Sequence, residues 1–164
     1  MTTPSHLEWA AGSLSLFLVL AGACGARPHN SPVDTREVEV LKRAYAAFNR
    51  NDIAGAVVDV DSLAEWSEPA EFPGGGTYHG REEVASYLAQ SRANWAEGSS
   101  EPERFIPVGG RMVVFVLARV RLKSSGQWHE TRLADVFTFR NGRIVHMRAF
   151  ADRDQALRWA GAKP

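Results

Sequence analysis

The sequence predicts an α+β domain in which helices come first and a long antiparallel sheet comes last. Two patterns carry this prediction. The first half of the domain places apolar residues at spacings of three and four, which is typical of amphipathic helices. From Arg104 onward the apolar runs are rich in β-branched and aromatic residues, and turn dipeptides separate them at 109–110, 125–126 and 141–142. The expected layout is therefore a set of helices covering one face of a curved sheet.

Length and composition fit one domain with a single hydrophobic core and a short extension, because the chain has 164 residues and is 45% apolar. The 19 Lys and Arg residues balance the 19 Asp and Glu residues, so no global field attracts nucleic acid, and no nucleic-acid partner is expected. Cys24 is the single cysteine, which excludes an internal disulfide. The five histidines are scattered without zinc-site spacing. Neither a metal nor a cofactor is predicted.

Residues 1–33 form a segment distinct from the predicted domain, which spans residues 34–164. Residues 10–24 make an apolar run of the length of a signal-peptide core, too short for a membrane span. The stretch before it contains Glu8 and no Lys or Arg, which is the wrong charge for a signal. Three interpretations stay open: an export signal, a lipid anchor at Cys24, and a later translation start that leaves the segment unmade. Among the locations, the cytoplasm is slightly favoured.

The first helix of the domain is predicted to begin at Asp34 or Thr35, either of which can cap it, and to end at Arg50. Its apolar stripe consists of Val38, Leu41, Tyr45 and Phe48. The hydroxyl-bearing ring of Tyr45 therefore lies on the buried side. A second, short helix is predicted over residues 53–58.

A short strand is predicted over residues 64–68, ended by Pro69 and a loop with three successive glycines. Because strand side chains alternate between faces, Trp66 and Glu68 share one face. A third helix is predicted after Gly80. Its apolar positions are Val84, Tyr87, Leu88, Ser91 and Trp95.

Four antiparallel strands are predicted near residues 103–108, 112–123, 128–140 and 143–150, followed by a last helix over 153–160. The Asn141-Gly142 pair is a strong signal for a tight hairpin turn.

In the third of these strands, Asp135 alternates in phase with the apolar residues Leu133, Phe137 and Phe139, so its carboxyl group points with them. Burial disfavours the charged form of a carboxyl group, so this one is expected to keep its proton. His129 has the same parity and is interpreted as an exposed hairpin residue.

Each of the three polar residues on apolar faces also has an ordinary structural interpretation. Tyr45 fits a packing residue whose hydroxyl finds any convenient partner. Glu68 fits a surface residue at a strand end, and Asp135 fits an aspartate held by a backbone amide or an arginine at a sheet bend. The residues alone leave both sets of interpretations open.

Four segments, residues 42–52, 66–69, 76–84 and 135–145, resemble the SnoaL-like branch of the NTF2-like superfamily. This superfamily includes ketosteroid isomerase, polyketide cyclases and limonene epoxide hydrolase. The resemblance implies a cone in which N-terminal helices pack on a strongly curved antiparallel sheet and enclose a pocket.

Ketosteroid isomerase is the most suggestive relative. The resemblance places Tyr45 at its oxyanion-hole tyrosine, Asp135 at its protonated aspartate and Glu68, which precedes Pro69, at its base. It implies that Glu68 takes a proton next to a carbonyl while Tyr45 and neutral Asp135 stabilise the oxygen. Glutamate at the base position departs from the family pattern, because its extra methylene moves the carboxylate.

The residues expected to line the pocket are Phe48, Trp66, Tyr87, Phe137 and Met147. An apolar small molecule is the expected ligand. A homodimer is expected through the outer sheet face, where the arginines 119, 121, 132, 140 and 148 are predicted to lie. The sequence leaves two functions open: an isomerase or cyclase, and a protein that binds an apolar ligand or serves as a dimeric scaffold without catalysis.

Overall fold

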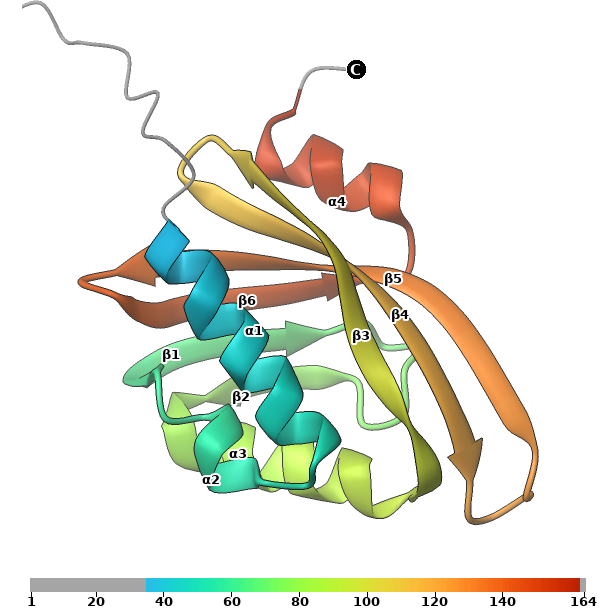
Figure 1. The fold of residues 1–164 in the computed structure, drawn as a ribbon. Coiled ribbons are helices and arrows are strands. Elements are labelled where there is room, and N and C mark those ends of the chain that lie inside the picture. Colours follow the sequence, from blue (N-terminus) through green and yellow to red (C-terminus); the bar gives the residue numbers. More distant parts are fainter. Residues whose placement is uncertain (1–34, 163–164) are drawn as a thin grey trace, which may run out of the picture. The chain divides into compact units, whose positions relative to one another are not determined.

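The computed structural model describes residues 35–162 of the chain, and these form four helices and six strands (Figure 1). In chain order the elements are α1 (Thr35–Asn49), α2 (Ile53–Ala56), β1 (Val60–Glu68), β2 (Gly76–His79), α3 (Gly80–Ala93), β3 (Trp95–Val108), β4 (Arg111–Leu122), β5 (Trp128–Arg140), β6 (Arg143–Phe150) and α4 (Arg153–Ala160). The predicted signal-like segment and the capping residue Asp34 lie outside the described residues. Within the described part, no helix is long and apolar enough to cross a membrane.

The strands form one six-stranded sheet in the order β2-β1-β6-β5-β4-β3. The predicted meander is confirmed as β3 to β6, in which each strand pairs antiparallel with the next. The sheet as a whole is mixed, because β1 pairs parallel with β6. A parallel pair needs a long crossover, and the chain between β1 and β6 supplies one. Figure 1 shows the meander curling around α1, without closing into a barrel.

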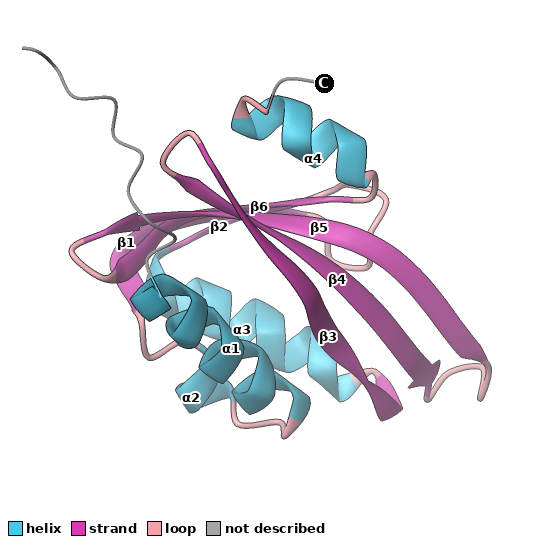
Figure 2. Cartoon of the chain, turned by 45° about the horizontal axis from the view of Figure 1, so that its top comes forward, coloured by secondary structure: helices cyan, strands magenta, loops and turns pink. Residues whose placement is uncertain are grey.

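Helices cover both faces of the sheet, whereas the sequence predicted them on one face only. Figure 2 shows α1, α2 and α3 on one side and α4 on the other. The successive residues Val113 and Val114 of β4 are both fully buried, so this strand has apolar cover on each face. Val114 belongs to the inner core, with Leu41 and Val84. Val113 belongs to the outer core, whose other buried members are Ala134, Val136, Phe150, Ala156 and Ala160.

The strand β3 begins at Trp95, well before the predicted start, and Trp95 therefore belongs to the sheet and not to the third helix. The local sequence does not indicate a strand here, because the segment contains Gly98 and Pro102, which are uncommon within strands. The pairing with β4 shifts register beside both residues. The short strand β2 also lies where a loop was predicted, and it pairs with the end of β1. Pairing across the sheet outweighs the local preference in both places.

Gly98 has a backbone conformation that a side chain would strain, with φ near +120°. A Cβ atom here would lie 2.2 Å from the carbonyl oxygen of Arg119, on the neighbouring strand. We expect Gly98→Ala to lower the free energy of unfolding by about 3 kcal/mol, measured by urea denaturation. Gly126→Ala is the matched control, because Gly126 also has positive φ but open space around it. It should cost only about 1 kcal/mol. Equal losses in the two variants would contradict the contact with Arg119.

The side chain of Asn49, at the end of α1, pairs with the edge strand β3. Its Nδ2 donates to the carbonyl oxygen of Ser100 at 3.1 Å, and its Oδ1 accepts from the Ser100 amide at 2.8 Å. The guanidinium of Arg92 on α3 donates to the Asn49 carbonyl oxygen at 3.4 Å. These contacts join the end of α1 to both α3 and the sheet.

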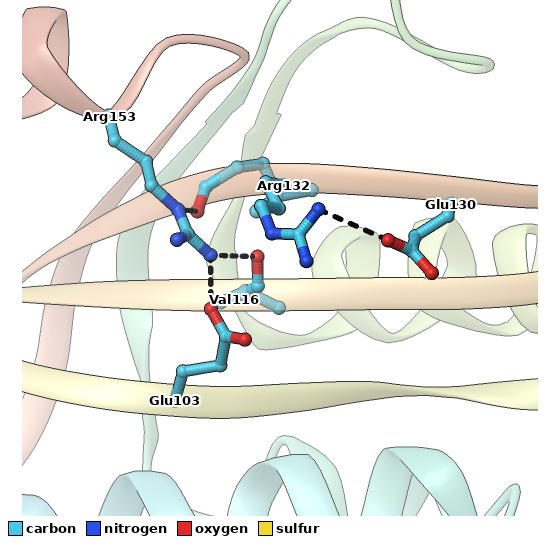
Figure 3. A network of polar contacts seen from close by, with 6 residues as sticks. Glu103, Val116, Glu130, Arg132 and Arg153 are labelled. Carbon is cyan, nitrogen blue, oxygen red and sulfur yellow. Dashed lines mark hydrogen bonds and ion pairs between the residues drawn. The ribbon is translucent and has the colours of Figure 1, made fainter.

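On the outer face, arginines are paired with carboxylates and carbonyl groups. Arg153 of α4 donates to Glu103 of β3 at 2.6 Å and to the carbonyl oxygen of Val116 of β4 at 2.8 Å (Figure 3). Arg132 contacts Glu130 at 3.1 Å. The homodimer through this face stays a prediction. Because α4 covers Val113 and its neighbours, only the remaining outer surface is open to such a contact.

Candidate functional site

A cavity of about 520 Å³ opens between α1, α3 and the inner face of the sheet, and it contains the three polar residues singled out from the sequence. Tyr45 reaches it from α1, Glu68 from the end of β1 and Asp135 from the middle of β5. The remaining wall is largely aromatic and includes Phe48, Trp66, Phe72, Tyr87, Trp95 and Phe137. The structure therefore brings together side chains that are far apart in sequence.

Tyr45 and Asp135 are joined directly, because the Tyr45 hydroxyl donates a hydrogen bond to Oδ2 of Asp135. The helical stripe of α1 directs the Tyr45 ring inward, where it meets the ring of Phe137 edge-on at 6.4 Å between centroids. Asp135 points to the same side as Phe137, since the two are separated by one residue along β5. One oxygen of Asp135 is occupied by Tyr45.

Glu68 is held by donors from two elements. The indole Nε1 of Trp66 donates to Oε1 of Glu68 at 2.8 Å, which follows from their positions on the same face of β1. Tyr87 of α3 is a second hydrogen-bonding partner of the Glu68 carboxyl group. Because an indole can only donate, Oε1 acts as an acceptor, and a proton on Glu68 lies on Oε2.

The two carboxyl groups have raised pKa values. Burial and, to a smaller extent, the charge of Asp135 raise the pKa of Glu68, and the hydrogen bonds from Trp66 and Tyr87 lower it, so that the net value is about 8. Burial also raises the pKa of Asp135, to about 6, although the hydrogen bond from Tyr45 lowers it. Near neutral pH the pair therefore holds one proton, on Glu68.

Both pKa values are raised, as the sequence led us to expect, but their order favours Glu68 as the protonated group, whereas the family pattern has Asp135 neutral and Glu68 as the base. At Glu68 the neighbouring charge of Asp135 adds to the effect of burial. At Asp135 the Tyr45 hydroxyl stabilises the ionised form. Burial also raises the pKa of Tyr45, so this residue stays a hydrogen-bond donor over the whole physiological range.

Four of the five residues expected to line the pocket do so: Phe48, Trp66, Tyr87 and Phe137. Met147 does not, because it is 1% exposed and packs in the inner core. It pairs with Trp66 of β1 on one side and Phe137 of β5 on the other, and these larger side chains line the cavity at that level. His129 is exposed, as expected of a hairpin residue, and also borders the cavity.

Sequence reasoning missed two parts of the wall. The loop between β1 and β2 contributes Glu71, Phe72 and Pro73. The only hint in the sequence was an aromatic residue, Phe72, in a glycine-rich loop. A loop has no regular spacing of side chains, so the sequence did not predict where this ring points. Trp95 was assigned to a helix, and it instead meets the ring of Phe48 edge-on at 5.2 Å from the first residue of β3.

The fold and the cavity define an NTF2-like α+β protein. Residues 41–147 match the SnoaL-like domain family, which is more than half of the chain. The chain belongs to this family. Among curated proteins, no match to the sequence was found.

Solved structures share this architecture. An NTF2-like protein of unknown function from Burkholderia pseudomallei K96243 is 28% identical, and the match covers 77% of this chain and 98% of that one with a TM-score of 0.64. TerC, co-crystallised with polyporic acid, is 24% identical over 77% of this chain and 99% of its own, with a TM-score of 0.63. A Jannaschia sp. CCS1 protein assigned as a SnoaL-like polyketide cyclase is 17% identical over 84% of this chain and 100% of its own, with a TM-score of 0.64.

Proposed function

We propose that this protein binds an apolar carbonyl compound in the cavity and moves a proton at the carbon next to the carbonyl group, as an isomerase or a cyclase does. One observation carries the proposal. Two carboxyl groups, Glu68 and Asp135, face one aromatic cavity with pKa values on either side of neutrality. Two carboxyl groups whose pKa values differ in this way can serve as the acid and the base of one reaction.

In this mechanism the Asp135 carboxylate is the base. Its Oδ2 is fixed by Tyr45, so the other oxygen is free to accept the proton from the substrate carbon. The electron pair of the broken C–H bond moves toward the carbonyl oxygen. Glu68, protonated on Oε2, donates a hydrogen bond or its proton to that oxygen and so stabilises the enolate. Return of a proton to a different carbon completes an isomerisation.

The size of the cavity supports a ligand of several fused or linked rings, because ligand pockets of drug-sized molecules span about 300–1,000 Å³. The neighbours support the same class of ligand. TerC was crystallised with polyporic acid, and another neighbour carries the assignment of polyketide cyclase. We therefore place polycyclic and polyketide-like ketones first among the compounds to be tried.

Binding without catalysis is the second candidate function. The aromatic wall favours it, because Phe48, Trp95 and Phe137 can hold an apolar molecule whatever the state of the carboxyl groups.

Deuterium incorporation separates the two functions. Cyclic ketones that bind the wild-type protein are incubated in D₂O, and exchange next to the carbonyl is followed by NMR. The catalytic proposal expects exchange well above the buffer rate. If every ketone that binds exchanges only at the buffer rate, the protein is a binder and the catalytic proposal is wrong.

Tyr45→Phe tests the positioning of the base. Loss of the hydroxyl removes the hydrogen bond that lowers the pKa of Asp135, so Asp135 ionises at higher pH. We expect the acid limb of the activity profile to move to higher pH and the maximal rate to fall about tenfold. Tyr78→Phe is the matched control, because the Tyr78 hydroxyl bonds the carbonyl oxygen of Gly74 outside the cavity wall. An unchanged acid limb in Tyr45→Phe would remove Tyr45 from the mechanism.

A further inference from the structure

The cavity wall combines carboxyl groups and aromatic rings, and among its described residues it has neither lysine nor arginine. We propose that the cavity takes a hydrophobic ammonium compound, protonated or quaternary, whose positive charge lies between Glu68 and Asp135. This names a ligand class for the same cavity. It rests on the proposed function only in using that cavity as the ligand site, and an amine-bearing ketone would satisfy both proposals.

Four elements and one loop contribute the ionisable groups of the wall, whereas the lining residues of α2, β3, β4 and β6 carry none. They are Tyr45 of α1, Glu68 of β1, Glu71 of the β1–β2 loop, Tyr87 of α3, and His129 and Asp135 of β5. Three of them are carboxyl groups. Burial keeps the two tyrosines protonated and neutral, so they add donors and no positive charge. An anionic ligand would therefore meet only carboxylates and neutral donors at the inner end of the cavity.

The arginines near the cavity are engaged outside it. The guanidinium of Arg92 lies over the Trp95 ring, 5.3 Å from its centroid, and donates to the carbonyl oxygen of Asn49. Arg81 donates to the carbonyl oxygen of Val60 at 2.8 Å. Neither side chain lines the cavity. Within residues 35–162 the cavity wall thus supplies no lysine or arginine for the charge of the carboxyl pair, and without such a partner a buried carboxyl group retains a proton.

The aromatic rings around Glu68 and Asp135 are the second feature that suits an ammonium ligand. Trp66 and Phe137 meet edge to face at 6.1 Å, and Tyr45 meets Phe137 in the same manner. An aromatic face carries negative charge density and attracts a cation, most strongly when water is excluded. Carboxylates together with aromatic faces favour a positive ligand over a neutral one of the same shape.

Proton linkage gives this proposal a signature that a neutral ligand lacks. An ammonium group between the two carboxyl groups favours their ionised forms, so its binding releases the proton held by Glu68. Affinity should then rise with pH, by up to tenfold per pH unit below the pKa of Glu68. An anionic ligand needs the protonated acid and should show the opposite trend.

The experiment compares naphthylmethyl-trimethylammonium with its uncharged isostere, in which carbon replaces the quaternary nitrogen. Binding to the full chain is measured by isothermal titration calorimetry at about pH 6 and about pH 8.5, in buffers of different ionisation enthalpy that reveal proton release. We expect the cation to bind at least tenfold more tightly than the isostere at the higher pH, and to release about one proton from Glu68 at the lower pH, where the free protein still holds that proton. The Glu68→Gln/Asp135→Asn double variant should lose most of the preference for the cation, and Glu130→Gln, on the outer face, should behave as wild type.

Equal or tighter binding of the neutral isostere at the higher pH would overturn the proposal, as would failure of the cation to bind at millimolar concentration. A cation preference that persists undiminished in a folded double variant, checked by circular dichroism, would also overturn it. These outcomes are separate from the test of catalysis. If neutral ketones exchange deuterium but the cation is not preferred over its isostere, only the ammonium proposal is wrong. If the cation is preferred but no ketone exchanges, only the catalytic proposal is wrong.

Discussion

Asp135→Asn is expected to lower the rate of proton exchange in a bound ketone about a thousandfold, the largest catalytic effect of any single change in the cavity. An amide cannot accept the proton from carbon. The substitution nevertheless keeps the shape of the side chain, and its oxygen can still accept the hydrogen bond from Tyr45. The fold and the affinity for a neutral ketone should therefore be preserved while turnover is lost. Single-turnover NMR measurements of exchange separate the two effects.

The same substitution has a second readout that a merely structural role would not give. The charge of Asp135 raises the pKa of Glu68, so its removal should move the pKa of Glu68 down. Carbon-detected NMR of the Glu68 carboxyl group measures this directly. Asp154→Asn is the control, because Asp154 lies in the first turn of α4 on the other side of the sheet. If Asp135→Asn keeps wild-type exchange rates, another group is the base.

The second large effect concerns stability. Glu68→Gln should make the protein more stable than wild type in alkaline solution, by about 3 kcal/mol near pH 9, a value reduced to allow for the partial exposure of Glu68. The folded state holds the Glu68 proton up to a pKa of about 8, whereas the unfolded chain releases it near 4.5. Between these values unfolding releases a proton, so the stability of the wild type falls as pH rises. Glutamine does not titrate and escapes this loss.

Urea denaturation at a series of pH values checks this expectation. The two proteins should have the same free energy of unfolding near pH 4, where Glu68 is protonated in both states, and diverge as pH rises toward about 8. Glu130→Gln, an exposed partner of Arg132, should follow the wild-type curve at every pH. A wild type that gains stability through this interval relative to Glu68→Gln would mean that Glu68 is ionised in the folded protein.

The helical stripes and the hairpin turns could be predicted because both depend on neighbouring residues. The spacing of Leu41, Tyr45 and Phe48 and the Asn141-Gly142 turn are local signals, and the structure confirms the elements they predict. The parallel pairing of β1 with β6 has no such signal, because the two strands are far apart in the sequence. The early start of β3 depends in the same way on its partner β4.

In the candidate site, too, the sequence predicts one part and leaves another undetermined. Strand alternation and helical spacing were enough to direct Tyr45, Glu68 and Asp135 inward, and this much follows from the residues themselves. Which carboxyl group holds the proton depends on the Tyr45 hydroxyl, on the Trp66 indole and on the separation of the two acids. These are properties of three-dimensional packing. The family pattern implies that the aspartate keeps the proton, whereas the pKa values in this chain favour the proton on Glu68.

The pairing of Asn49 with Ser100 bears on self-association as well as on the fold. A long strand at the edge of a sheet exposes unpaired amide and carbonyl groups, onto which a strand of another molecule can add. Here the amide side chain of Asn49 takes the place of one residue of such a strand, with a donor and an acceptor facing Ser100. Pro102 and Pro107 lack amide donors on the same strand. The edge of β3 is thus blunted against the edge-to-edge addition that begins aggregation.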